Sequence, residues 1–145
     1  MKPPTKVFIS YNHTDENSVT KLRNHLAPAI NQKLLTIWYD RELLAGSELN
    51  DEIISELDSA DIVIFLVSSE FLGSYYCHEV ELSRTLDRKR YNDVCIIPLI
   101  LKACDWQSTK LGKYTAIPTD AKPVTLHKDQ DSAFFDCVTK IKKSA

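Results

Sequence analysis

The chain has 145 residues, of which 43% are hydrophobic and 26% charged, and its formal net charge is −2 with a pI near 6.1. This length suits one domain over residues 1–145, which would bury roughly 70% of the surface that the unfolded chain exposes. The near-neutral charge and the absence of a basic stripe argue against nucleic acid as a direct ligand. Four cysteines without CxxC spacing, and no secretory signal at the start, predict free thiols in a cytoplasmic protein.

The first part of the chain is predicted to alternate strand and helix. Lys6–Ser10 is a short β-rich run, and Thr14 or Asp15 can cap a helix whose apolar residues recur at steps of three and four. Pro28 should bend or end that helix. Leu34–Tyr39 is a second strand, and a polar loop after it leads to a second amphipathic helix.

Two runs in the middle of the chain, Ile62–Val67 and Val94–Leu101, are apolar without alternation. Both faces of these strands are therefore expected to be buried, as in the centre of a parallel sheet. Neither run is long enough to span a bilayer, so we expect no membrane segment. A loop over Ser68–Tyr76 separates the first of these strands from a third helix.

The end of the chain is less regular. An irregular stretch with one helical turn near Leu111 precedes Lys122–Leu126, which we expect to be a short edge strand because Pro123 cannot donate to a central ladder. The helix Ala133–Ile141 closes the domain. Five strands alternating with helices predict an α/β fold, a flavodoxin-like doubly wound parallel sheet in the order 2-1-3-4-5.

Sheets of this kind bind ligands beyond the carboxyl ends of their strands, at the switch point between strands one and three. This rule nominates three loops, at Ser10–Asp15, Asp40–Ser47 and Ser68–Glu81. A Rossmann fingerprint and a P-loop are excluded, because none of the three glycines lies near the first strand. A phosphoacceptor receiver domain is excluded too, because Ser68 stands where it needs an aspartate.

Few residues in these loops suit catalysis. None of the four histidines has another histidine or a cysteine at the i+3 or i+4 position, so no metal site is predicted. Cys77 and His78 are neighbours on a helix and diverge by about 100°, too far to form a thiolate–imidazole pair. Glu79 and Glu81 begin the third helix at the rim of the expected crevice. Favourable placement in the helix dipole is their ordinary explanation, and a functional carboxylate is the alternative.

Several segments occur in an order and spacing typical of one family. They are Val7–Tyr11 followed by Asp15, Trp38–Gly46, Ala60–Ser68, Phe71–Leu72, Tyr76–Cys77, Glu81–Leu82, Ile97–Leu101 and Cys104–Trp106. Together they resemble the Toll/interleukin-1 receptor (TIR) domain of the bacterial type over nearly the whole chain. The resemblance implies the TIR fold.

For enzymatic members, the resemblance also implies cleavage of the bond between nicotinamide and ribose in NAD. The family's catalytic glutamate follows an aromatic-and-cysteine element and precedes an apolar residue, which selects Glu81, with Glu79 as the runner-up. One carboxylate suffices, because nicotinamide leaves a cationic pyridinium as a neutral amine and needs no general acid. The carboxylate stabilises an oxocarbenium-like transition state. NAD is then the substrate, and no cofactor is expected.

Further residues of the nominated loops are expected to hold the nucleotide. They are Ser10, Tyr11, Trp38, Asp40 and Arg41. Two of them have ordinary alternatives, since Trp38 also suits the core and Arg41 also suits a pair with Glu42.

The loop after the second strand carries Leu43, Leu44 and Ala45 in a row, which a solvated loop has little reason to do. This loop mediates head-to-tail contacts in TIR assemblies, so we expect a homo-oligomer or filament; folding back onto the third helix is the alternative. The resulting hypothesis is an NAD glycohydrolase that yields ADP-ribose or a cyclic derivative.

The resemblance also implies a biological setting, the effector of a bacterial antiphage system that self-assembly activates. A sensor domain or partner protein outside these residues would supply the trigger. Two rival functions stay open at this point. One is a non-catalytic TIR–TIR scaffold, and the other is a host-directed signalling mimic.

Overall fold

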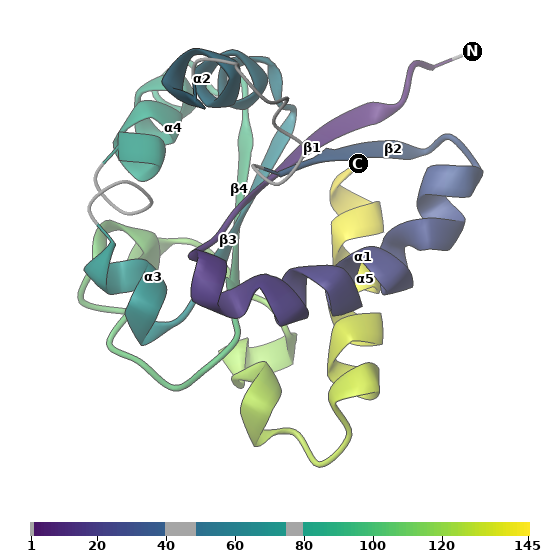
Figure 1. Cartoon of the computed structure of the whole chain (residues 1–145), viewed down its shortest axis with the longest axis vertical. Coiled ribbons are helices and arrows are strands. Elements are labelled where there is room, and N and C mark those ends of the chain that lie inside the picture. The colour runs from purple at the N-terminus through teal and green to yellow at the C-terminus, as the bar shows by residue number, and fades with distance from the viewer. Residues whose placement is uncertain (1, 40–48, 75–79) are drawn as a thin grey trace.

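Residues 2–39, 49–74 and 80–145 are the part of the chain that the computed structural model describes (Figure 1). Four strands in this part form one parallel sheet, in the order β2-β1-β3-β4. They are β1 (Thr5–Ser10), β2 (Leu35–Trp38), β3 (Ile62–Val67) and β4 (Cys95–Ile100). The predicted α/β class and the order of the first four strands are confirmed.

Helices cover both faces of the sheet. The α-helices of the described residues are α1 (Glu16–Asn31), α2 (Leu49–Ser59), α3 (Ser69–Gly73), α4 (Leu82–Lys89) and α5 (Gln130–Ser144). Figure 1 shows α1 and α5 side by side on one face and α2 and α4 on the other. This is the doubly wound arrangement that alternating strands and helices favour.

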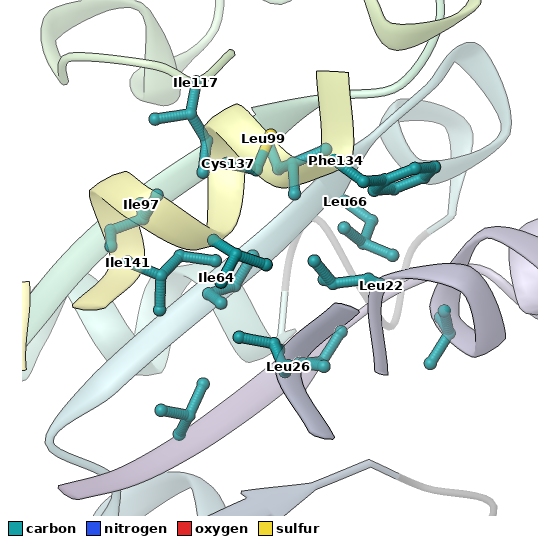
Figure 2. Packing of buried hydrophobic residues seen from close by; sticks show 14 of the residues in the cluster. Leu22, Leu26, Ile64, Leu66, Ile97, Leu99, Ile117, Phe134, Cys137 and Ile141 are labelled. Atoms are coloured by element: carbon teal, nitrogen blue, oxygen red, sulfur yellow. The ribbon is translucent and has the colours of Figure 1, made fainter. Parts of the chain in front are cut away.

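The hydrophobic core has two halves, one on each side of β3. Every side chain of β3 is at most 1% exposed. The half toward α1 and α5 is shown in Figure 2, with the labelled residues Leu22, Leu26, Ile64, Leu66, Ile97, Leu99, Ile117, Phe134, Cys137 and Ile141. The half toward α2 and α4 includes Phe8, Ile53, Leu57, Phe65 and Leu82. The continuous apolar run of β3 follows from this, because successive side chains enter different halves.

The fifth strand predicted at Lys122–Leu126 is not found among the described residues, so this prediction was wrong. Val124–Leu126 form a single 3-10 turn, η6, and Ile117 makes an isolated bridge to Leu99 at the outer edge of β4. On that edge Ile100 donates its N–H to the Ile117 carbonyl at 2.9 Å, whereas Pro98 has no N–H and only accepts from Ile117, also at 2.9 Å. Because Pro98 lies in the middle of β4, it removes a donor that a continuous ladder would need.

Two predicted helix boundaries also differ. Within the loop predicted over Ser68–Tyr76 the structure has α3, which Ser68 caps by accepting the Phe71 N–H at 3.1 Å. The buried Phe71 ring then fixes this short helix against the sheet. Helix α1 does not end at Pro28 but continues to Asn31. Pro28 lacks only its own N–H, so one intrahelical hydrogen bond is lost, and the last turn still forms because Gln32 donates its N–H to the Pro28 carbonyl at 3.0 Å.

The predicted helical turn near Leu111 is confirmed as the 3-10 turn η4 (Lys110–Lys113), in which Leu111 is buried. The described cysteines, Cys95, Cys104 and Cys137, are free thiols in the structure. None of the helices in the described part of the chain is long and apolar enough to cross a membrane.

Candidate active site

The carboxyl ends of the strands gather polar side chains at one edge of the sheet. Ser10 ends β1, Ser68 follows β3, and Lys102 lies just beyond the end of β4. The parallel register pairs Ser10 with Phe65, so the ends of β1 and β3 are adjacent. This is the switch point at which doubly wound sheets bind their ligands.

Ser10 and Glu81 meet at this edge. Alternation along β1 turns Phe8 into the core half that contains α2 and α4, and it turns Ser10 to the same face two residues later. The Ser10 Oγ donates to Glu81 Oε1 at 2.5 Å, and the two residues are only 1% and 5% exposed. The sequence nominated both residues for different roles, and the structure places them in contact.

Glu81 occupies the N-cap position of α4 with helical backbone angles, and its side chain makes no capping hydrogen bond. Its backbone is held in place because Thr85 Oγ1 donates to the Glu81 carbonyl at 2.8 Å and Leu82 is buried beside it. The carboxylate is directed to Ser10 instead. Simple capping therefore does not account for this acid.

A second buried carboxylate lies at the same edge. Asp15, which is 3% exposed, accepts from Ser68 Oγ at 2.5 Å, and its other oxygen is 3.0 Å from Lys102 Nζ. Lys102 also lies 3.3 Å from Glu70 on α3. Thr14 or Asp15 was expected to cap this helix; Asp15 occupies the N-cap position of α1, but its side chain makes no capping hydrogen bond. Through Ser68 and Lys102, Asp15 links the end of β1 to the ends of β3 and β4.

The pKa values of Lys102 and Glu70 shift as those of paired charges should. The hydrogen bond to Asp15 raises the pKa of Lys102, with a further contribution from Glu70. Lys102 in turn lowers the pKa of Glu70. Sequence reasoning missed Lys102, although a signal was present. It is the first charged residue after the apolar run Val94–Leu101, so it had to lie at the same edge as Ser68.

The predicted substrate-binding residues divide between the two faces of the sheet. Trp38 is half-buried and lies on the same face as Ser10, where its ring stacks on Phe8 at 5.3 Å between centroids. Tyr11 lies in the opposite core half, 5% exposed, with its ring 6.3 Å from that of Tyr39. The structure therefore groups Trp38 with Ser10 and separates Tyr11 from them. Tyr11 packs in the core, and its role in substrate binding stays a prediction.

Several predicted residues lie outside the described part of the chain. They are the binding residues Asp40 and Arg41, the assembly residues Leu43, Leu44 and Ala45, and the alternative acid Glu79. Their roles stay predictions. Within residues 2–39, 49–74 and 80–145, no three His, Cys, Asp or Glu side chains are grouped so that they could hold a metal ion.

A family model of the TIR domain matches residues 7–138. The chain belongs to the TIR domain family. Among curated relatives, the "Uncharacterized protein y4lF" of Sinorhizobium fredii is 35% identical over 139 residues, which cover 96% of this TIR domain and 43% of that protein. This TIR domain thus spans less than half the length of the relative.

Solved structures with the same fold are also TIR domains. The TIR domain of the Toll-related receptor TRR-2 from Hydra magnipapillata has a TM-score of 0.65 and 18% identity, with 94% of this chain and 97% of that chain covered. The TIR domains of the activated Roq1 resistosome, which recognises the pathogen effector XopQ, have a TM-score of 0.56 and 17% identity, with 97% and 85% covered. At these identities the likeness establishes the fold alone.

Proposed function

We propose that this TIR domain cleaves NAD at the bond between nicotinamide and ribose, with Glu81 as the catalytic carboxylate. One observation carries the proposal, namely the buried Glu81 carboxylate that Ser10 contacts at 2.5 Å. It lies at the carboxyl edge of the sheet, where doubly wound folds bind their ligands. Glu81 is also the acid at the position that the family's enzymatic members use.

The proposed reaction begins with rupture of the C1′–N bond, and nicotinamide leaves as a neutral molecule with the electron pair. The positive charge that remains is shared between C1′ and the ribose ring oxygen, and the Glu81 carboxylate stabilises it. The oxygen of a water molecule then bonds to C1′ and releases a proton, which gives ADP-ribose. If a nitrogen of the adenine attacks instead, the product is cyclic. Neither route needs a general acid.

Ser10 is proposed to position Glu81. A hydroxyl that donates to one carboxylate oxygen fixes the orientation of the carboxylate relative to the sheet. Trp38 lies on the same face of the sheet and offers an aromatic surface to the nucleotide. Asp40 and Arg41 are proposed to contact the nucleotide from the following loop.

The direct test is incubation of the purified domain with NAD and measurement of nicotinamide by chromatography. We expect release with wild type, loss with Glu81→Ala and Glu81→Gln, and retention of most activity with Glu79→Ala. Glu56→Ala, a half-buried acid on α2, serves as a control. Circular dichroism and melting curves confirm that each variant is folded. If Glu79→Ala loses activity and Glu81→Ala keeps it, the assignment of the acid is wrong.

A non-catalytic scaffold is the second candidate, and one observation favours it. The Ser10–Glu81 hydrogen bond is buried and satisfied, so it also has the ordinary role of a polar link in the core. Absence of nicotinamide release at every protein concentration would favour this function, or that of a host-directed signalling mimic.

The biological setting that we propose is immune defence, as the effector of a bacterial antiphage system. The match to a longer protein of Sinorhizobium fredii supports a bacterial context. The activated resistosome that recognises a pathogen effector supports an immune one. Assembly of the TIR domains, started by a sensor domain or a partner protein, would then activate cleavage.

A further inference from the structure

A groove of about 710 Å³ lies at the far end of α4 from Glu81, between the last turns of that helix and the segment around η4. Its half-buried residues Leu86 and Tyr114 belong to the edge of the hydrophobic core. The charged residues that line it are Asp87, Lys89, Arg90, Lys110 and Lys113. Four cations and one carboxylate therefore share one groove in a domain whose net charge is −2.

The cations of α4 fall into two groups. Arg84 and Arg88, one turn apart, have carboxylate partners, Asp58 at 2.7 Å and Asp93 at 3.5 Å. Arg90 is exposed, and among the described residues it has no carboxylate within ion-pair distance. The positive charges of Arg84 and Arg88 are thus paired within the domain. The positive charge of Arg90, which faces the groove, has no such carboxylate partner among the described residues.

The opposite wall of the groove adds two more cations without acidic partners in the described ranges. Lys110 and Lys113 are exposed and belong to the 3-10 turn η4. Side chains three residues apart in a 3-10 helix eclipse each other, so both project from the same side of the turn. Lys113 Nζ also lies 5.4 Å over the Tyr114 ring. Lys89 differs, because it donates to the Val94 carbonyl at 3.2 Å.

This wall is held rigidly before any ligand arrives. Leu111 is fully buried, and Thr109 both donates to the Trp106 carbonyl at 2.6 Å and accepts from Leu111 N–H at 3.2 Å. A Cβ at Gly112 would lie 2.1 Å from the Gln107 carbonyl oxygen, so only glycine allows this close turn. The positions from which Lys110 and Lys113 project are thus fixed, which lowers the entropic cost of binding.

We propose that this groove is a second binding site, for a small phosphorylated nucleotide. Arg90, Lys110 and Lys113 hold the phosphates through charge-assisted hydrogen bonds, and Tyr114 and Leu86 contact the base or the ribose. The volume lies within the range of small-ligand pockets. A nucleic-acid strand would need a basic stripe that continues beyond the groove, and the sequence has none.

The site is separate from the candidate active site. Arg90 follows Glu81 by nine positions, about 13 Å along a helix axis. The groove therefore does not depend on the proposed cleavage of NAD. Its ligand has two possible sources, a product of NAD such as ADP-ribose or an unrelated nucleotide such as ATP, and both share the phosphorylated ribose.

The test is titration of the ¹⁵N-labelled domain with ADP-ribose, ATP and inorganic pyrophosphate, followed by two-dimensional NMR. We expect saturable shifts of the amides of Lys110, Gly112 and Tyr114 with both nucleotides. Lys110→Glu/Lys113→Glu should weaken this binding by about tenfold or more. The control Lys21→Glu/Lys128→Glu changes the charge equally at exposed lysines elsewhere and should keep it. Stronger binding of ADP-ribose than of ATP identifies an NAD product as the source, and the reverse an unrelated nucleotide.

Four results would overturn the proposal. The first is the absence of saturable shifts at these amides with either nucleotide. The second is equal loss of binding in both double variants. The third is tighter binding of a single-stranded oligonucleotide than of either nucleotide. The fourth is pyrophosphate binding as tight as nucleotide binding, which would indicate charge attraction alone. If the charge reversal impairs folding, Lys110→Gln/Lys113→Gln replaces it. None of the probes carries the nicotinamide–ribose bond, so the result stands apart from the test of NAD cleavage.

Discussion

Ser10 and Glu81 are 71 positions apart in the chain and are joined by a 2.5 Å hydrogen bond at the buried end of β1. The bond links a strand end to a helix start, and it is the contact through which the sheet can set the orientation of the proposed catalytic carboxylate. Because both residues are almost fully buried, water cannot readily replace either partner.

The first prediction concerns this bond. Ser10→Ala should lower kcat for nicotinamide release by about tenfold, the equivalent of one hydrogen bond to a charged group, with little change in KM. Ser59→Ala, which removes an exposed hydroxyl on α2, should change neither constant. Steady-state kinetics on the two variants check this. An unchanged kcat in Ser10→Ala would show that Ser10 does not position Glu81.

The second prediction concerns pH and metal ions. A reaction that needs one ionised carboxylate and no ion should keep its full rate in EDTA. Its rate should fall only toward acid pH, where the carboxylate becomes protonated and can no longer stabilise a positive charge. A pH profile of kcat with and without EDTA measures both effects. Loss of activity in EDTA that zinc or magnesium restores would contradict the single-carboxylate mechanism.

Most of the fold follows from sequence pattern, because the driving signal is local. The unbroken apolar run of β3 predicted a central strand, and all of its side chains are buried. The missing fifth strand depends on something the pattern does not contain, namely which edge of β4 Pro98 faces. That is decided by the pairing of β4 with β3.

The candidate site could be predicted only as a set of loops. The strand-end rule nominated the loops that contain Ser10 and Glu81, but their contact depends on how α4 is placed over β1. Lys102 was missed because its partner Asp15 lies 87 positions earlier, and no local pattern joins them. The opposite directions of Ser10 and Tyr11 could have been predicted, since consecutive residues of an extended chain face opposite sides.

The third prediction uses the Asp15 cluster. Asp15→Asn keeps the size of the side chain but removes the charge that pairs with Lys102, so it should lower the free energy of unfolding by about 1–3 kcal/mol. Glu70→Gln changes the other partner of the same lysine, a side chain that is 33% exposed, and it should leave stability nearly unchanged. Urea unfolding compares the two. Equal losses of unfolding free energy in the two variants would show that the burial of Asp15 does not strengthen its contribution to stability.

The fourth prediction concerns alkaline pH. Burial raises the pKa of the Cys137 thiol to about 12. Below the pKa of the unfolded thiol, about 8.5, neither state loses this proton and the contribution to stability is complete. Above it, only the unfolded chain loses the proton, so the free energy of unfolding should fall by up to about 1.4 kcal/mol per pH unit until the folded thiol also ionises.

Cys137→Ala should flatten this alkaline slope, although the cavity it leaves lowers stability at all pH values. Val138→Ala also removes a buried group from α5 without removing a thiol, and it should keep the wild-type slope. Urea unfolding between pH 8 and pH 11 gives both slopes. The same slope in wild type and Cys137→Ala would assign the alkaline loss of stability to other groups.

The last prediction is that activity requires self-association. Leu43, Leu44 and Ala45 follow one another in the segment after β2 that the sequence predicts to be a loop and that lies outside the described residues. Three consecutive apolar residues in a loop favour contact with a surface. In TIR assemblies this loop joins neighbours head to tail, which builds open filaments because the two contacting surfaces differ. If each active site is completed by its neighbour, the dilute monomer should be nearly inactive.

Nicotinamide release per milligram should therefore rise steeply with protein concentration, in parallel with light scattering. Leu44→Asp should suppress this rise while the melting temperature of the monomer stays unchanged. Leu126→Asp makes the same substitution at a leucine that is 58% exposed on η6, and it should retain the rise, because charge on an unrelated surface leaves the loop contact intact. Constant specific activity from a species that stays monomeric across the whole dilution series would contradict the requirement for self-association. The three apolar residues would then be assigned to packing within their own domain.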